Sequence, residues 1–252
     1  MTQPEGSSPL IACRGLAVGF GGRAILPPLD FEVRTGEFWA LLGNNGSGKT
    51  TLIRTLLGLL PRVGGEIQRA ADIVMSYVPQ RTELDPTIPG RLIDFVGTGR
   101  DRGWSFIDLF RTNDHAATRK ALQDARCDDL ALQQLSHLSE GQKARAVLAR
   151  ALVSNPNVLV LDEPTSSVDA ATERVVFELL DILRRERQLG LLVVSHRSEL
   201  FIGRATHAVY VDRAGGVAAA GEFDSITRSA VFISRHGPIA SPASPPPVSP
   251  MH

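Results

Sequence analysis

The sequence predicts an α/β fold in which a buried parallel sheet is interrupted by a helical insertion. Continuous apolar runs, FWALLG, VLVL and LLVV at 38–43, 158–161 and 191–194, are typical of strands buried on both faces. A helical pattern around 170–187 separates the last two runs. Between about 81 and 154, strand-like runs disappear and helical patterns replace them.

The first third of the chain is expected to hold strands, tight turns and one helix. The strands are expected at 10–20, 30–33, 38–42 and 73–78. Gly21 and Gly22 turn the first strand, and residues 34–37 turn between the next two, which are expected to form a pair. The helix is expected over 49–60, where Pro61 ends it.

The rest of the chain is expected to complete the sheet after the helical insertion. Helices are expected near 91–95, 116–125, 141–152 and 170–187, and a closing pair of strands at 207–211 and 216–220. One domain therefore covers 10–236, with a helical subdomain at about 81–154. A loose leader is expected at 1–9, and the Pro/Ser-rich tail at 237–252 is expected to be disordered, as a linker without function would be.

The composition is that of a soluble globular protein. Hydrophobic residues make up 43% and charged residues 21%, both ordinary values. Lys+Arg and Asp+Glu number 27 each, so no basic surplus indicates a nucleic-acid partner. Cys13 and Cys127 are expected to be reduced thiols. No apolar run approaches the roughly 18 residues of a membrane-spanning helix, so any role at a membrane is expected to depend on a partner protein.

A phosphate-binding loop is the clearest motif in the chain. The segment Gly43-Asn44-Asn45-Gly46-Ser47-Gly48-Lys49-Thr50 fits G-x-x-x-x-G-K-[ST] between a predicted strand and a predicted helix. Glycines allow backbone amides to surround phosphate oxygens, and the helix N-terminus adds a favourable dipole. Lys49 is expected to reach the β- and γ-phosphates of a bound nucleotide, and the Thr50 hydroxyl to bind Mg²⁺. Thr51, next in the helix, belongs to the same expected nucleotide site.

Two carboxylates, Asp162 and Glu163, follow the buried strand at 158–161. Successive residues of a strand point to opposite sides, so the two acids are expected to have different roles. Asp162 suits the Mg²⁺ shell, and Glu163 suits a general base that polarises the attacking water. Taken alone the pair could equally be solvated acids, but the upstream phosphate loop favours the catalytic interpretation.

Gln80 and His196 also follow predicted strands, so both are expected at the same edge of the sheet. His196 is expected to hydrogen-bond the γ-phosphate. Gln80 can supply a neutral oxygen to Mg²⁺ or to the attacking water. Either residue alone would more often be structural, and only the combination with the phosphate loop indicates a catalytic role.

Taken together, these motifs resemble those of the ATP-binding cassette (ABC) ATPases. The order is Walker A at 43–50, a Q-loop at Gln80, the signature LSEGQ at 138–142, Walker B at 158–163 and a D-loop-like SSVD at 166–169, followed by a switch histidine. The resemblance covers about residues 10–225. It implies a P-loop NTPase (RecA-like) core with an antiparallel β subdomain and an α-helical insertion, and hydrolysis of ATP with Mg²⁺.

In this family two cassettes pack head to tail, so the resemblance implies a homodimer. The signature residues Ser139, Gly141 and Gln142 would then contact the ATP held by the other copy, where a helix start favours an anion. Asp169 of the D-loop would help to link the two sites. The same Ser139 can also cap its own helix.

Two positions depart from the usual family pattern. Glu140 stands where the signature usually has glycine, and it is expected to point away from the triphosphate, toward a basic side chain. Phe20 lies where the family stacks an aromatic ring, often Tyr, on adenine. The alternative for Phe20 is an ordinary core aromatic.

A single cassette of this kind resembles the separate ATPase subunit of a transporter. The resemblance implies a cytoplasmic protein, peripheral on the inner face of the cell membrane, docked on integral-membrane permease subunits near the residues after Gln80. A solute-binding protein would be an indirect partner, and no nucleic acid is expected. Residues 76–104 resemble the zinc/manganese/iron-type metal importers. Haem, siderophore or drug cargo, and a soluble ABC protein without a transport role, remain alternatives.

Overall fold

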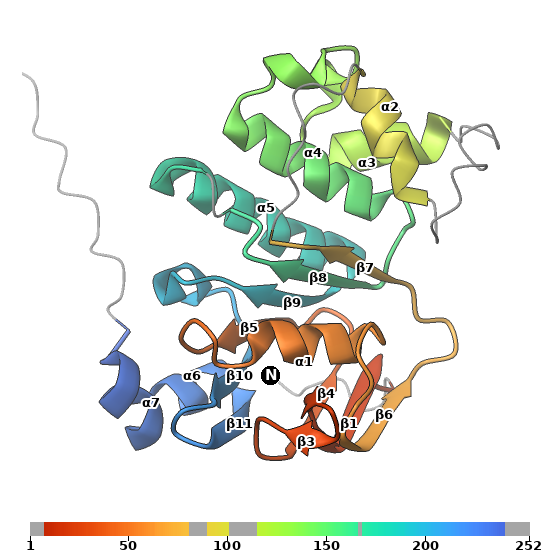
Figure 1. Cartoon of the computed structure of the whole chain (residues 1–252). Coiled ribbons are helices and arrows are strands. Elements are labelled where there is room, and N and C mark those ends of the chain that lie inside the picture. Colours follow the sequence, from red (N-terminus) through yellow and green to blue (C-terminus); the bar gives the residue numbers. More distant parts are fainter. Residues whose placement is uncertain (1–7, 81–89, 101–114, 166–167, 240–252) are drawn as a thin grey trace, which may run out of the picture.

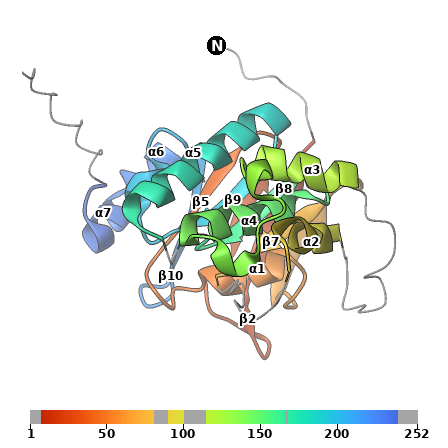
Figure 2. The ribbon, with the colours of Figure 1, turned by 90° about the horizontal axis from the view of Figure 1, so that it is seen from above.

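The computed structural model describes residues 8–80, 90–100, 115–165 and 168–239. Its main body is a six-stranded sheet with helices on both faces, and a lobe of helices continues one end of that body (Figure 1). Seen from above, this lobe lies on the side of β7 and β8, and the C-terminal helices lie on the opposite side, beyond β10 (Figure 2). The predicted α/β class with a helical insertion is confirmed.

The six-stranded sheet has the order β11-β10-β5-β9-β8-β7. Its strands are β5 (Phe38–Leu42), β7 (Met75–Val78), β8 (Val158–Asp162), β9 (Gly190–Val194), β10 (His207–Asp212) and β11 (Val217–Glu222). Neighbours pair in parallel except β10 and β11, which are antiparallel. Every residue of β5, β8 and β9 is buried, as their continuous apolar runs predict.

The two faces of this sheet belong to two hydrophobic cores. Along β5, Phe38, Ala40 and Leu42 pack with helices of the lobe and of the C-terminal half. The alternate residues Trp39 and Leu41 pack with α1 and the second sheet. The strict alternation follows from the two-residue repeat of a β-strand.

The second sheet is antiparallel and was only partly anticipated. It has the order β4-β1-β6 and comprises β1 (Ile11–Ala17), β4 (Leu29–Val33) and β6 (Gly64–Arg69). The expected pairing of the strands on either side of the 34–37 turn is wrong, because β4 pairs with β1 whereas β5 pairs with β9 and β10. Strand β6 was not predicted, since none of its residues is buried and it carries no apolar pattern.

A short hairpin forms at the first predicted turn. Strands β2 (Gly19–Phe20) and β3 (Arg23–Ala24) pair across Gly21 and Gly22, which both have positive φ. The hairpin places a strand break between 17 and 19 in the segment for which one continuous strand was expected.

Helix α1 (Lys49–Leu56) is shorter than predicted. The expectation that it continues to Pro61 is wrong because Gly58 adopts the left-handed region (φ 77°) and its N–H bonds to the Thr55 carbonyl. The chain therefore leaves the helix one turn before the proline. This ending is a common glycine C-cap.

The remaining helices follow the predicted insertion and add a C-terminal pair. They are α2 (Leu92–Gly97), η1 (Thr98–Arg100), α3 (His115–Asp124), η3 (Asp128–Leu130), η4 (Leu135–His137), α4 (Glu140–Leu152), α5 (Ala170–Arg187), η5 (Ser198–Phe201), α6 (Phe223–Thr227) and α7 (Ala230–His236). Sequence patterns did not predict α6 and α7. The residues of the expected leader and tail lie largely outside the described part of the chain. Within the described part, no helix combines the length and apolarity needed to span a membrane.

Candidate active site

Four strands of the sheet deliver the candidate site to one edge. Strands β5, β7, β8 and β9 run parallel, so their carboxyl ends lie together. The phosphate loop follows β5, Gln80 follows β7, Glu163 follows β8 and His196 follows β9. Chain order and spatial order differ here, because β5 lies beside β9 and β7 lies at the sheet's edge. Such a crossover is where open α/β sheets commonly bind ligands.

The phosphate loop depends on glycines in the left-handed region. Gly43, Gly46 and Gly48 have φ values of 143°, 74° and 108°. A Cβ added at Gly43 would lie 2.2 Å from the Val211 carbonyl oxygen, so only glycine fits there. Asn44, Asn45 and Gly46 form the exposed bend of the loop, with Ser47 and Lys49 buried and Thr50 and Thr51 in the first turn of α1.

The Lys49 side chain lies inside this loop and hydrogen-bonds the loop's own backbone. Its Nζ donates to the carbonyl oxygens of Gly43, at 2.7 Å, and Asn44, at 2.9 Å. Burial lowers the pKa of Lys49, and the carboxylates of Glu163 and Asp162 act in the opposite direction. The buried Ser47 Oγ has no hydrogen-bond partner among the described residues. A buried cation, an unpartnered hydroxyl and the N-terminus of α1 suit a polyphosphate ligand.

The side chains of Thr50, next to Lys49 in α1, and Asp162, at the end of β8, are in contact. The Thr50 hydroxyl donates to Asp162 Oδ2 at 3.1 Å, and Asp162 is buried at the end of β8. Burial raises the pKa of Asp162, while the hydrogen bond from Thr50 favours the ionised form. A hydroxyl and a carboxylate are the hard oxygen donors that Mg²⁺ prefers, so this pair fits that ion. Among the described residues no three His, Cys, Asp or Glu side chains form another metal-binding group.

Glu163 contacts two residues, Gln80 and His196, and the Thr50 hydroxyl contacts Asp162. The Glu163 carboxylate accepts a hydrogen bond from Gln80 Nε2 at 2.7 Å and lies 2.5 Å from His196 Nε2. Three residues that the sequence placed on separate strands are therefore in direct contact. Asp162 and Glu163 have separate partners, which suits the different roles expected of them. In this structure the amide of Gln80 contacts Glu163, whereas its expected partner was Mg²⁺ or water.

The backbone of Glu163 is strained. It has φ 54°, in the left-handed region that disfavours non-glycine residues, and its N–H bonds to the Val194 carbonyl at 3.1 Å. Such a conformation costs about 1–3 kcal/mol and is concentrated at functional sites. The neighbouring strand β9 thus maintains the backbone turn that directs this carboxylate toward Gln80 and His196.

The signature segment begins α4 with a complete capping box. Ser139 Oγ accepts from the Gln142 N–H at 3.3 Å, and Gln142 Oε1 accepts from the Ser139 N–H at 2.9 Å. Glu140 is exposed and pairs with Lys143 at 2.7 Å, so a basic side chain is its partner. Each capping group satisfies a backbone donor that the helix start would leave free.

The signature also packs closely on the D-loop helix of the same chain. A Cβ added at Gly141 would lie 2.5 Å from the Thr172 methyl group. Thr172 is held by Asp169, which accepts from the Thr172 hydroxyl at 2.8 Å and caps α5 through the N–H groups of Ala171 and Thr172. These hydrogen bonds lower the pKa of Asp169. Sequence reasoning missed Thr172, although Asp169 before a helical run is itself an N-cap signal.

Phe20 lies in the β2–β3 hairpin and is 55% exposed. The core alternative for this ring is therefore wrong. An exposed aromatic ring is available for stacking, which is what the expected adenine contact needs.

The C-terminal helix α7 adds residues that the motifs did not predict. A pocket of about 360 Å³ borders the phosphate loop and His196, and Phe232 and His236 of α7 form part of its wall. Burial lowers the pKa of His236, and its ring stacks on Phe232. Nothing in the local sequence pattern distinguishes this histidine from a surface one, because only the docking of α7 brings it to the loop.

Comparison with known proteins agrees with this arrangement. The ABC transporter family model matches residues 26–166. The zinc import ATP-binding protein ZnuC of Pseudomonas putida is 32% identical over 234 residues, covering 93% of this chain and 86% of that protein. ZnuC of Buchnera aphidicola is 32% identical over 228 residues, covering 90% of each chain.

Solved structures share the fold. An inward-facing ABC transporter, described as of the metal-chelate type, superposes with a TM-score of 0.79 at 24% identity, covering 91% of this chain and 88% of that one. A nucleotide-free ATP-binding cassette superposes with a TM-score of 0.74 at 18% identity, covering 90% and 98%. With the phosphate loop, the Glu163 cluster and the capped signature helix in one fold, the chain belongs to the ABC transporter family and is an ATPase of that family.

Proposed function

We propose that this ATPase powers the import of a divalent metal ion of the zinc/manganese type. The observation that carries the proposal is the 32% identity with zinc import ATP-binding proteins over 93% of the chain. The contact of Glu163 with Gln80 and His196 supports a hydrolytic site on the same chain. The cargo would pass through other subunits.

Hydrolysis is assigned to groups of this chain in separate roles. The amides of the phosphate loop and Lys49 Nζ bind and orient the β- and γ-phosphates. Thr50, Asp162 and Gln80 would hold Mg²⁺, which neutralises charge on the phosphate oxygens when it is bound.

Glu163 accepts a proton from the water that attacks the γ-phosphorus, so that ATP and water give ADP and inorganic phosphate. His196 Nε2 lies beside Glu163 Oε1, and we propose that it orients that carboxylate and hydrogen-bonds a γ-phosphate oxygen.

A second copy of the chain would complete each site. At the capped start of α4, a 13-residue helix, Ser139 is exposed and Gly141 is partly exposed on this copy. A helix N-terminus favours an anion, so these groups suit the γ-phosphate held by a partner in a head-to-tail homodimer. Asp169 binds Thr172, the residue that packs against Gly141 of the signature, and would link the two sites.

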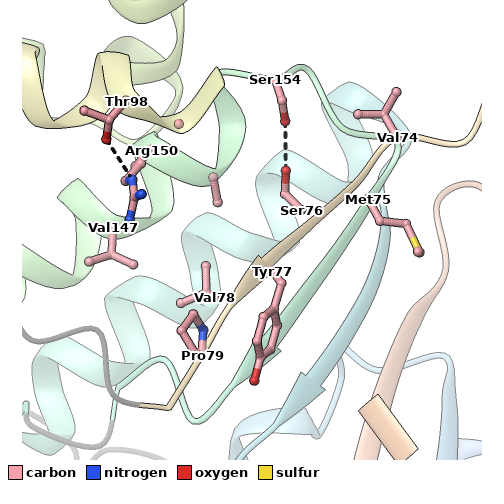
Figure 3. A pocket seen from close by; sticks show the side chains of 12 residues that line it. Val74, Met75, Ser76, Tyr77, Val78, Pro79, Thr98, Val147, Arg150 and Ser154 are labelled. Carbon is pink, nitrogen blue, oxygen red and sulfur yellow. Dashed lines mark hydrogen bonds between the residues drawn. The ribbon is translucent and has the colours of Figure 1, made fainter. Parts of the chain in front are cut away.

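The proposed permease contact lies beside β7 and the helical lobe. A pocket of about 250 Å³ separates them there, lined by 74–79 on one side and by Thr98, Val147, Arg150 and Ser154 on the other (Figure 3). A hydrogen bond between Ser76 and Ser154 crosses this region, and one from Arg150 to Thr98 lies on its helical side. We propose that integral-membrane permease subunits dock near it at the inner face of the cell membrane, with a solute-binding protein as an indirect partner.

The test is transport by the assembled complex. The protein is co-purified with its membrane subunits, placed in vesicles with Mg²⁺-ATP, and assayed for uptake of zinc and manganese against haem and a siderophore. Metal uptake that Glu163→Gln abolishes is the expected result. Uptake of haem, siderophore or a drug alone would overturn the metal assignment, and recovery with ribosomes in place of membrane proteins would overturn the transport assignment.

A further inference from the structure

A buried carboxylate outside the family motifs joins the two loops that carry Glu163 and His196. Glu173 lies in the first turn of α5, and its residue is 6% exposed. Its Oε1 accepts a hydrogen bond from the Thr165 hydroxyl at 2.8 Å. Its Oε2 pairs with Arg197 Nη1 at 3.0 Å. Thr165 follows Glu163 by two residues, and Arg197 follows His196 directly.

We propose that Glu173, through Thr165 and Arg197, is a positioning residue for ATP hydrolysis that sets the distance between Glu163 and His196. The two catalytic candidates meet at one end, where His196 Nε2 contacts Glu163 Oε1. A pocket of about 250 Å³ is lined by Glu163, His196 and the Glu173 network. Because this space borders both catalytic candidates, the loops are not held by side-chain packing alone, and the contacts of Glu173 with Thr165 and Arg197 connect them.

The ion pair between Glu173 and Arg197, called the bridge below, also has a fixed geometry. Arg197 uses Nη1 for Glu173 and Nε for Glu199, which lies 2.8 Å away, so the planar guanidinium is oriented by two carboxylates. A buried carboxylate must be paired, and removing one partner of such a pair leaves an uncompensated charge. Glu173 therefore resists any movement that separates the Thr165 loop from the Arg197 loop.

The inference rests on the roles proposed for Glu163 and His196, and its test separates the two. Purified protein is assayed for ATPase activity without cargo, with kcat and KM for Mg²⁺-ATP measured together with equilibrium binding of a fluorescent ATP analogue. If Glu163→Gln leaves kcat unchanged, the proposed catalytic roles fail. If Glu163→Gln lowers kcat and the bridge variants do not, only the present inference fails.

Three variants probe the bridge. Arg197→Met should lower kcat by about tenfold, less than the ~100-fold that a 1 Å misplacement can cost, with KM and ATP affinity within about twofold of the parent. Thr165→Val, which keeps the shape and removes the hydroxyl, should lower kcat several-fold. Arg197→Lys should recover part of the loss, because a lysine keeps the charge but lacks the fork that contacts both carboxylates.

A double variant and a matched control make the result specific. Glu173→Gln is measured alone and in combination with Arg197→Met. The double variant should be no slower than Arg197→Met alone, since both substitutions act on one contact. Arg204→Met is the control. Arg204 pairs with Glu178 of α5 at 3.7 Å and donates to the Leu200 carbonyl, and none of its interactions among the described residues involves Glu173, Thr165 or Arg197. Multiplicative losses in the double variant, an equal loss in Arg204→Met, or a parallel fall in ATP affinity would overturn the proposal.

Discussion

The contact between Gly141 and Thr172 predicts a specific defect and its repair. In Gly141→Ala the new Cβ would lie 2.5 Å from the Thr172 methyl carbon. Two carbon atoms normally pack about 3.5–4.0 Å apart, so the methyl group has to move by roughly 1 Å. Rotating Thr172 away would break its 2.8 Å hydrogen bond to Asp169, so the helices α4 and α5 separate or the bond is lost.

The expected change in the free energy of unfolding of Gly141→Ala is the sum of two opposing effects. Overpacking of this kind costs about 1–3 kcal/mol, and replacing glycine by alanine in a helix returns up to ~1 kcal/mol. We therefore expect Gly141→Ala to lower the free energy of unfolding by about 1 kcal/mol. Thr172→Ser removes the obstructing methyl group and keeps the hydroxyl that Asp169 binds.

Urea denaturation of Gly141→Ala, Thr172→Ser and the double variant measures these changes in the free energy of unfolding. In the Thr172→Ser background, Gly141→Ala should be neutral or stabilising, because only the helix-propensity gain remains. Loss of stability in that background equal to the loss in the parent would refute the steric explanation. Stability is the suitable measurement, since Gly141 is also proposed to contact ATP of a second copy and activity would fall for either reason.

Three further outcomes are expected. Glu163→Gln should lower kcat by at least about 100-fold and accumulate an ATP-bound dimer, seen by size-exclusion chromatography with Mg²⁺-ATP; normal turnover contradicts the general-base role. Ser139→Ala should cripple turnover without changing ATP binding by the monomer, whereas Glu140→Gly should be nearly silent; an inactive Glu140→Gly protein means that the other side of the loop faces phosphate. The folded protein lowers the pKa of Asp169, so the ionised side chain stabilises the fold at pH values above the ordinary aspartate pKa of about 3.9. This stabilisation is lost as the pH falls through the pKa of Asp169 in the folded protein. The difference in melting temperature between the parent and Asp169→Asn should therefore become smaller in acid, and a difference that does not change with pH would contradict this role.

Features encoded by short-range patterns were predicted well. The fully buried strands β5, β8 and β9 each correspond to an uninterrupted apolar run in the sequence. Helix α5 has the bounds predicted for it, because Asp169 caps one end and the apolar pattern ends near Gln188, which adopts φ 53°. The phosphate loop is likewise a local motif whose glycines meet local backbone requirements.

Other features depend on which segments pack together. Strands β4 and β5 are adjacent in the chain yet lie in different sheets, and no property of the turn between them encodes that separation. Strand β6 forms although none of its residues is buried, because the polar groups of its backbone pair with β1. A pattern of apolar residues cannot indicate pairing of this kind.

The sequence by itself determined the family, the α/β class and the residue types of the site, because each is carried by a few residues close together in the chain. Only the tertiary structure decided that Glu163 contacts both Gln80 and His196, that its backbone is strained, and that Glu173 bridges Thr165 to Arg197. These contacts join residues on different strands, loops and helices. Their geometry is set by how the parallel strands align at one edge of the sheet, and that alignment depends on the packing of both cores.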